Sequence, residues 1–173
     1  MTQQLLDIET FPKDSAILEP AAGDYAIAKV LMKNGYEVIC KDISTGEDFL
    51  KEAGTYDCLV TNPPFSIGLP FVLKAKQVCK QKFAMLFPLY YLHGKQRYDQ
   101  IWQDREFPLS HVYVFARYPL LGDKLREDGK YKTGMMVYAW YVWSRSPIGN
   151  EPIIRWIDNS NYVIGKNHEL EQV

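Results

Sequence analysis

The sequence predicts an α/β fold in which a mostly parallel, doubly wound sheet carries an antiparallel hairpin at one edge. In the first half, short apolar runs alternate with amphipathic stretches, which is typical of strands joined by helical crossovers. In the second half, two runs rich in Val, Tyr and Trp follow each other with no helical pattern between them. The 173 residues contain no repeat and no long linker, so we expect one domain spanning residues 1–173.

The first elements follow from the spacing of apolar residues. Residues 15–19 form a short apolar run that ends at a proline, and residues 24–33 carry an apolar face with a glycine just beyond. These patterns predict a buried strand and then a helix. Residues 36–41 and 56–61 are further apolar runs of strand length and predict the next two strands.

The middle of the chain continues the alternation of helix and strand. Residues 71–80 place lysines on one side of an amphipathic pattern and predict a helix. Residues 82–89 predict a strand, and residues 94–105 predict another helix. These elements extend the parallel half of the sheet.

Two of the last elements are expected to form an antiparallel pair. Residues 111–117 and 135–145 read as two strands, and residues 153–157 as a further short strand. The connection at residues 121–133 contains four cations and three anions. It is interpreted either as a solvated hairpin connection or as a flap that contacts a polyanion, because loops of this length are often functional.

Composition excludes several classes of protein. The 20 Lys and Arg residues are balanced by 21 Asp and Glu residues, so the chain has no general basic coat, although a local basic patch remains compatible with this balance. Cys40, Cys58 and Cys79 have no metal-site or disulfide spacing, and Cys40 and Cys58 lie in apolar runs and read as buried apolar residues. Three scattered histidines predict no metal site. No apolar stretch is long enough to span a membrane, and no targeting segment is evident, so we expect a cytoplasmic protein.

Polar residues follow the predicted strands, at the sheet edge where α/β proteins bind ligands. Glu19 ends the first strand and is followed by a small-residue turn through Ala21 and Gly23. Asp42 follows the second strand, 19 residues beyond Gly23, a position suited to binding ribose hydroxyls. A turn or helix cap is the alternative interpretation of Asp42. No glycine-rich phosphate loop is present, which argues against dinucleotides and nucleoside triphosphates.

The most specific motif is Asn62-Pro63-Pro64-Phe65, directly after the predicted strand at residues 56–61. The prolines hold the turn extended and exclude a helical conformation at Asn62. The Asn62 side-chain oxygen and the Pro63 carbonyl oxygen can then accept both hydrogens of one amino group, which leaves the nitrogen lone pair available for attack. Phe65 offers a surface on which a planar base can stack. A proline-rich turn ahead of a helix is the structural alternative.

Taken together, these motifs resemble those of class I S-adenosylmethionine-dependent amino-methyltransferases, which have a Rossmann-like fold. The likeness is greatest to small adenine-specific DNA methyltransferases of the kind found in phage and prophage genomes. It covers residues 15–118 and is most specific between Glu19 and Phe65. The motifs that carry it are Leu18-Glu19-Pro20-Ala21-Ala22-Gly23-Asp24, Lys41-Asp42-Ile43, Glu47-Asp48-Phe49 and Asn62-Pro63-Pro64-Phe65.

The resemblance implies a role for each matching residue. Glu19, Ala21 and Gly23 would line the methionine end of S-adenosylmethionine. Asp42 would bind the ribose, and Ile43 would pack on the cofactor's adenine. The remaining residues that the resemblance assigns are Asp48 and Phe49 at the adenine amino group, and Asn62, Pro63, Pro64 and Phe65 at the target amine.

Three features depart from the family pattern. The family usually has glycine where Tyr25 stands, and a tyrosine there would narrow the cofactor pocket. Only 13 residues separate Asp42 from Tyr56, so the usual third strand must be abbreviated. The chain also has no insert of the size of a target-recognition domain, so we expect no separate domain for reading duplex sequence.

Further residues are candidates for contacting the substrate. Tyr90, Lys95 and Arg97 follow the predicted strand at residues 82–89 and should border the same crevice. A tyrosine there can stack on a flipped base, and the cations can contact phosphates. Arg117 ends the next predicted strand and joins them. An ordinary helix start with tyrosines in the core is the alternative. Cations that would strengthen a local patch are Lys124, Arg126, Lys130 and Lys132.

We therefore expect an S-adenosylmethionine-dependent methyltransferase that acts on an exocyclic amino group, with adenine N6 in DNA as the first hypothesis. Its substrate would be a nucleic acid. The same turn would serve RNA adenine, cytosine N4 or a protein glutamine amide, because each presents a conjugated amino group. A non-catalytic subunit with a degenerate cofactor fold is the alternative from another class, and a homo-oligomer or a partner subunit stays open.

Overall fold

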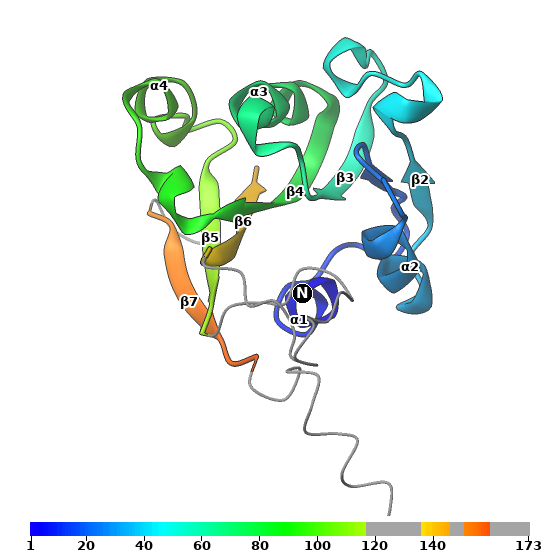
Figure 1. Ribbon diagram of the computed structural model, residues 1–173, viewed down its shortest axis with the longest axis horizontal. Helices are drawn as coiled ribbons and strands as arrows, with labels where there is room; N and C mark the ends of the chain where they lie inside the picture. Colours follow the sequence, from blue (N-terminus) through cyan, green and yellow to red (C-terminus); the bar gives the residue numbers. More distant parts are fainter. Residues whose placement is uncertain (117–135, 146–150, 160–173) are drawn as a thin grey trace, which may run out of the picture.

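The computed structural model describes residues 1–116, 136–145 and 151–159, and its seven strands form one sheet in the order β2-β1-β3-β4-β6-β5-β7 (Figure 1). The strands are β1 (Ile17–Glu19), β2 (Val38–Cys40), β3 (Tyr56–Thr61), β4 (Cys79–Pro88), β5 (Leu109–Phe115), β6 (Tyr138–Ser144) and β7 (Ile153–Ile157). The α-helices are α1 (Thr2–Leu6), α2 (Ala26–Lys33), α3 (Gly68–Val78) and α4 (Lys95–Arg97).

The strand directions confirm the predicted mixture of parallel and antiparallel pairing. β2, β1, β3 and β4 pair in parallel, whereas β6 is antiparallel to both of its neighbours, β4 and β5. The short strand β7 is the outermost strand and pairs in parallel with β5. Because β6 runs against the others, its first residue, Tyr138, pairs with Pro88 at the end of β4. The carboxyl ends of the parallel strands and the beginning of β6 therefore share one edge.

Helices cover both faces of the sheet, as expected for a doubly wound fold. Figure 1 shows α1 and α2 on one side and α3 and α4 on the other. Alternate residues of β4 supply the two cores: Phe83 and Met85 pack toward the α3 side, and Ala84 and Leu86 toward the α2 side. This period of two is why a single apolar strand can support two hydrophobic layers.

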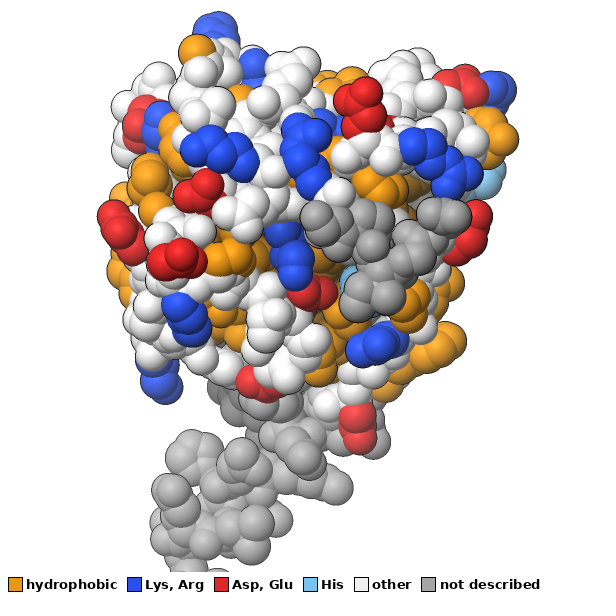
Figure 2. Space-filling view, turned by 180° about the vertical axis from the view of Figure 1, so that it is seen from behind, with side chains coloured by type: hydrophobic (Ala, Val, Ile, Leu, Met, Phe, Trp, Pro, Cys, Tyr) orange, Lys and Arg blue, Asp and Glu red, His pale blue; other side chains and the backbone are white. Residues whose placement is uncertain are grey.

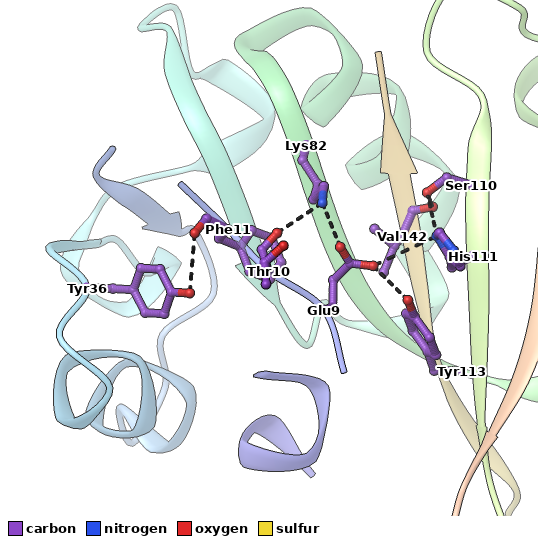
Figure 3. Close-up of polar contacts among 9 residues, drawn as sticks. All are labelled: Glu9, Thr10, Phe11, Tyr36, Lys82, Ser110, His111, Tyr113 and Val142. Carbon is purple, nitrogen blue, oxygen red and sulfur yellow. Dashed lines mark hydrogen bonds and ion pairs between the residues drawn. The ribbon is translucent and has the colours of Figure 1, made fainter. Parts of the chain in front are cut away.

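Residues 1–12, called here the N-terminal segment, cross the α2 side of the sheet. The sequence analysis assigned no element to these residues, whereas the structure places α1 among them. The Asn34 amide donates to the Gln3 side-chain oxygen (2.7 Å), which joins α1 to the end of α2. Farther along, the buried Glu9 lies between Lys82 on β4 and Tyr113 on β5 (Figure 3). The segment is thus fixed to the end of α2 through Gln3 and to the sheet through Glu9.

Two predicted helices have different limits in the structure. α3 begins three residues earlier than predicted because Pro70 is tolerated in a first helical turn, where an amide hydrogen has no intrahelical partner. It ends at Val78, and β4 takes the residues that follow. The predicted helix at residues 94–105 is wrong beyond Trp102: α4 and a π-helical turn (Tyr98–Trp102) end there. Asp104 instead accepts hydrogen bonds from the next backbone amides, and such side-chain bonds compete with helix formation.

The stretch between β2 and β3 is abbreviated, as predicted. It contains two 3₁₀ turns, Ile43–Thr45 and Phe49–Lys51, and no strand. β2 is consequently an outermost strand of the sheet. In the part of the chain that the structure describes, none of the helices has both the length and the apolar character needed to cross a bilayer.

Candidate functional site

A cavity of about 560 Å³ opens at the carboxyl ends of β1 and β3. We call it the crevice. It is lined by four residues that the sequence analysis selected: Glu19, Ala21, Gly23 and Asn62. Its volume lies in the range typical of sites for small molecules and cofactors. The expected convergence of residues from separate strand ends on one hollow is therefore present for these four.

The turn after β1 is fixed to the end of β2 by backbone contacts. The Ala22 amide donates to the Lys41 carbonyl oxygen (3.0 Å), and the Gly23 amide donates to the Asp42 carboxylate (2.9 Å). Gly23 has a φ of 51°, a left-handed conformation that glycine adopts at little cost. Asp42 thus lies beside the glycine turn, 19 residues away in sequence, although it does not itself line the crevice.

The Asp42 carboxylate is ionised at neutral pH. The hydroxyl of Ser44, followed by the amides of Ser44 and Gly23, holds the pKa of Asp42 below its usual range. The hydroxyl is 2.6 Å and the Ser44 amide 2.9 Å from the same carboxylate oxygen. Asp42 therefore caps the 3₁₀ turn that follows it, as the structural alternative held. The capping carboxylate is also charged and partly exposed at the crevice edge.

Glu19 is the most unusual group in the crevice. It is 1% exposed, and its Oε2 atom has no hydrogen-bond partner among the described residues. Burial raises the pKa of Glu19 to about 8, and the nearby charges of Asp24 and Asp42 add to this effect. The Ala28 amide is a hydrogen-bond partner of the carboxyl, but a buried oxygen without a partner is costly, and such groups gather at functional sites. The crevice therefore offers an acceptor for a cationic or hydrogen-bonding ligand group.

The Asn62-Pro63-Pro64-Phe65 turn leaves β3 in an extended form. Pro64 has a φ of −58° and a ψ of 121°, and it precedes a 3₁₀ turn at Phe65–Ile67. Asn62 is exposed and lines the crevice, whereas Pro63 is buried. The half-buried ring of Phe65 lies between Phe87 and Tyr138, with ring centroids 6.3 Å and 5.8 Å apart. Asn62 thus lines the hollow that Glu19 also lines.

Three further predicted cofactor residues do not line the crevice. Phe49 is 3% exposed and packs on Phe71 in the core, with ring centroids 4.9 Å apart. Asp48 accepts a hydrogen bond from the Leu50 amide (3.0 Å) and so caps a 3₁₀ turn. Ile43 is 68% exposed and leaves an apolar side chain open to contact. Of the three, Ile43 is the most exposed, and the Asp48 side chain is partly exposed.

The residues expected to contact the substrate are arranged unequally. Tyr90 is 63% exposed just after β4. Lys95 forms an ion pair with Asp99, and the Arg97 guanidinium donates to the His93 carbonyl oxygen. Each cation thus has a partner within its own turn. Because the Lys95–Asp99 ion pair is largely exposed, a phosphate can compete for Lys95, and the contacts of both cations with phosphates stay a prediction. Arg117 lies outside the described residues, as do Lys124, Arg126, Lys130, Lys132 and the connection at residues 121–133.

The structure also adds residues that the sequence analysis missed. Met1, Thr2 and Gln3 form part of the crevice wall, and the Trp140 indole donates to the Met1 carbonyl oxygen (3.3 Å). Trp140 is fully buried and also lines the crevice. No motif in the first three residues signals this role, because it depends on where the N-terminal segment crosses the sheet.

Tyr25 does not narrow the cavity. Its backbone has a φ of 64°, the conformation that glycine would adopt at this position, and its side chain is 46% exposed. Tyr25 is absent from the residues that line the crevice. The departure from the family pattern is thus accommodated by a strained backbone rather than by filling the pocket.

Comparison with known proteins gives structural matches only. No protein-family model and no curated protein sequence matches the chain. Magnesium protoporphyrin IX methyltransferase (ChlM) from Synechocystis PCC 6803 with bound SAH is similar over 84% of this chain and 80% of its own, with a TM-score of 0.56 and 13% identity. A type I restriction-modification methyltransferase subunit from Streptococcus thermophilus matches 92% of this chain and 45% of its own, with a TM-score of 0.59 and 11% identity. TrmN from Thermus thermophilus matches 83% of this chain and 47% of its own, with a TM-score of 0.54 and 16% identity.

These matches define the class of fold. The chain has the Rossmann-like fold of class I methyltransferases, as the sequence predicted. At identities of 11–16% the likeness concerns the fold alone. What the protein does has to be argued from the crevice itself.

Proposed function

We propose that this protein is an S-adenosylmethionine-dependent methyltransferase that acts on an exocyclic amino group, with adenine N6 in DNA as the first candidate. The observation that carries the proposal is the position of Asn62. Asn62 lines the same crevice as Glu19 and the glycine turn, on a fold shared with methyltransferases. A methyl donor held at Glu19 and an amino group held at Asn62 would therefore occupy one cavity.

The crevice fits the cofactor at its methionine end. Glu19 has a buried oxygen without a partner, and a ligand ammonium group would supply the missing donor. A ligand cation would also favour the ionised form of Glu19 and lower its pKa. When bound, S-adenosylmethionine supplies an electrophilic methyl group on a sulfonium. Ala21 and Gly23 line the same wall and present no large side chain, so a ligand can approach the backbone closely.

The edge of the crevice fits the nucleoside part of the cofactor. We assign the ribose hydroxyls to the ionised carboxylate of Asp42, next to Gly23. The exposed side chain of Ile43 would pack on the cofactor's adenine ring. Asp48 would accept a hydrogen bond from the amino group of that ring. Phe49, which packs on Phe71 in the core, would support the turn that contains Asp48.

The Asn62 turn would hold the target amine. The Asn62 side-chain oxygen and the Pro63 carbonyl oxygen each accept one N–H of the amino group, which keeps the lone pair on nitrogen. Phe65, half-buried after the two prolines, would stack on the base. Tyr90, which is exposed just after β4, is a second aromatic side chain that would stack on it. The proton of the methylated amine can pass to water, so the reaction needs no histidine base.

The decisive experiment replaces the amide of Asn62. We expect Asn62→Ala to lower methyl transfer by about a hundredfold or more, because it removes a hydrogen bond needed when the amine attacks. Cofactor affinity by calorimetry should stay near that of the wild type. Ser66→Ala, an exposed change in the same turn, is the matched control and should keep full activity. Wild-type turnover in Asn62→Ala would remove the basis of the proposal.

The substrate is identified by offering labelled cofactor with DNA, RNA and protein pools side by side. Incorporation into DNA adenine supports the first candidate. Incorporation into RNA adenine, cytosine N4 or glutamine amides would keep the reaction and change the substrate. Because Tyr25 leaves the crevice open, its position gives no support to a non-catalytic subunit with a blocked pocket. Failure to bind cofactor at all would favour that alternative.

A second test addresses the cofactor. Asp42→Ala should weaken S-adenosylmethionine binding about tenfold to a hundredfold, the usual value of a hydrogen bond to a charged group. Ser44→Ala is the control, since it removes a partner of Asp42 and leaves the carboxylate in place. Calorimetric titration of both variants separates the ribose contact from the turn cap. Equal affinities of Asp42→Ala and the wild type would contradict the ribose assignment.

A further inference from the structure

A second hollow, of about 470 Å³, lies at the other end of the strands from the crevice. It is lined by the first residues of β4, the last residue of β6 with Arg145, and residues 10–12 of the N-terminal segment. None of its lining residues also lines the crevice. We call it the basic hollow, because Lys80, Lys82 and Arg145 line it and no Asp or Glu does.

The three cations differ in how firmly they are engaged. Lys82 is held by Glu9 (2.6 Å) and by the Thr10 carbonyl oxygen (3.0 Å), as Figure 3 shows. Lys80 lies 3.6 Å from Asp57, and both side chains are substantially exposed, so this ion pair is weak. An anion entering the hollow can therefore compete for Lys80 at little cost.

Arg145 is the best placed of the three to bind an anion. Its guanidinium lies over the Phe107 ring (4.5 Å to the centroid), and one nitrogen donates to the Lys76 carbonyl oxygen (3.2 Å). No carboxylate pairs with it among the described residues. The guanidinium is thus held in position while keeping further N–H donors, the arrangement that suits bidentate binding of phosphate oxygens.

The surroundings of the cations match the same chemistry. Gln81 and Thr10 add neutral polar groups to the lining. Figure 2, the view from behind, shows Lys and Arg side chains spread over this face with Asp and Glu side chains scattered among them. The net charge of the whole chain is −1, so a hollow lined by three cations is a local feature rather than part of a general basic coat.

We propose that the basic hollow binds a phosphate group, independently of the crevice. Lys80 and Arg145 would contact the phosphate oxygens, and Lys82, already paired with Glu9, would add to the local positive potential. Thr61 pairs with Met85, so Asn62 lies about six residues along β4 from Lys80, which is roughly 20 Å. The phosphate would therefore not belong to the nucleotide whose base reaches Asn62. It would come from a distant part of a nucleic acid strand or from a free phosphate compound.

The test compares two double variants of the full chain without cofactor. Lys80→Ala/Arg145→Ala removes the two available cations of the hollow. Lys33→Ala/Arg155→Ala removes two exposed cations on α2 and β7 and is matched in net charge. Inorganic phosphate is titrated while amide chemical shifts are followed, and a short fluorescent single-stranded DNA is titrated by anisotropy at fixed salt.

We expect the hollow variant to weaken binding about tenfold or more and the control variant to change it by less than about twofold. Binding of inorganic phosphate, with shifts at residues 80–82, identifies a free phosphate group as sufficient. Binding of the oligonucleotide alone identifies a phosphodiester backbone. Equal losses in both double variants, or no binding of either probe by the wild type, would overturn the proposal. Since neither measurement uses methyl transfer, the site and the proposed function can fail separately.

Discussion

Two buried glutamates, Glu9 in the N-terminal segment and Glu19 in the crevice, have opposite surroundings. Both are less than a tenth exposed. Glu9 accepts from the Lys82 ammonium (2.6 Å) and the Tyr113 hydroxyl (2.8 Å), and His111 lies 3.8 Å away. Glu19 Oε2 has no hydrogen-bond partner among the described residues. The fold supplies hydrogen-bond partners for both oxygens of Glu9, whereas it leaves one oxygen of Glu19 available to a ligand.

The contrast shows that the contacts of the N-terminal segment stabilise the fold, whereas the crevice contains groups that lower its stability. The Glu9 contacts fix a segment that forms part of the crevice wall, so they support the site indirectly. The crevice itself contains an incompletely bonded acid with a pKa raised to about 8 by burial. It also adjoins Tyr25, the one non-glycine residue at positive φ among those described. Costs of this kind are common at functional sites.

The largest expected effect on stability is at Glu9. Glu9→Gln removes the charge opposite Lys82 and should lower the free energy of unfolding by about 3 kcal/mol, the lower end of the cost of breaking a buried ion pair. Glu37→Gln, at an exposed site, is the control and should change stability by less than about 0.5 kcal/mol. Urea denaturation of both variants measures the difference. Equal stabilities of the two variants would show that the Glu9 contacts contribute little.

The same substitution at Glu19 should act in the opposite direction. The folded pKa of Glu19 lies near 8, above the ordinary value of 4.5, so the folded state holds its proton more tightly than the unfolded state. Its contribution to stability is full below pH 4.5 and is lost as the pH rises through about 8. Glu19→Gln cannot ionise, so at pH 8 it should be more stable than the wild type by about 1–3 kcal/mol, the cost of an unsatisfied buried group.

The pH series makes the Glu19 prediction specific. The advantage of Glu19→Gln should shrink as the pH falls from 8 toward 4.5, where the wild-type carboxyl is protonated in both states. Thermal denaturation at several pH values measures it. Cofactor affinity should fall in the same variant, because a neutral amide attracts an ammonium less strongly. A variant that is less stable than the wild type at pH 8 would mean that Glu19 is satisfied in solution.

The smallest expected effect is at Tyr25. Tyr25→Gly relieves a left-handed conformation that costs an L-residue about 1–2 kcal/mol, while glycine costs about 0.5–1 kcal/mol in backbone entropy. We expect stability to change by less than about 1 kcal/mol and cofactor affinity by less than about threefold. Calorimetry and urea denaturation measure the two quantities. A large gain in affinity would mean that the tyrosine ring obstructs the crevice after all.

The convergence of Glu19, Gly23 and Asn62 was predictable because it follows from topology. The carboxyl ends of parallel strands lie at one edge of the sheet, so a residue at or just after the end of such a strand is expected at that edge. Consecutive apolar residues in β4, such as Phe83 and Ala84, point to opposite faces of the sheet and so predict that both faces are covered. Topology does not indicate a reaction, and the proposed reaction was inferred from the Asn62-Pro63-Pro64-Phe65 motif after β3.

Other features depend on contacts that no local pattern encodes. The crevice wall from Met1 to Gln3 depends on contacts with distant residues, because the Asn34 side chain donates to Gln3 and the Trp140 indole donates to Met1. Arg97 and Phe49 have suitable chemistry at suitable places in the sequence, yet one bonds to its own turn and the other packs in the core. Side-chain direction at such positions is decided by competition among neighbours, which sequence spacing does not report.

β6 begins where its neighbours finish, and this reversal fixes how the chain could be modified. Phe115 ends β5 and Tyr138 starts β6 on the crevice side of the sheet, so the polypeptide between them departs from and returns to a single rim. Changes made directly after Phe115 or directly before Tyr138 would therefore fall at the crevice edge of the sheet and outside the paired residues of β5 and β6.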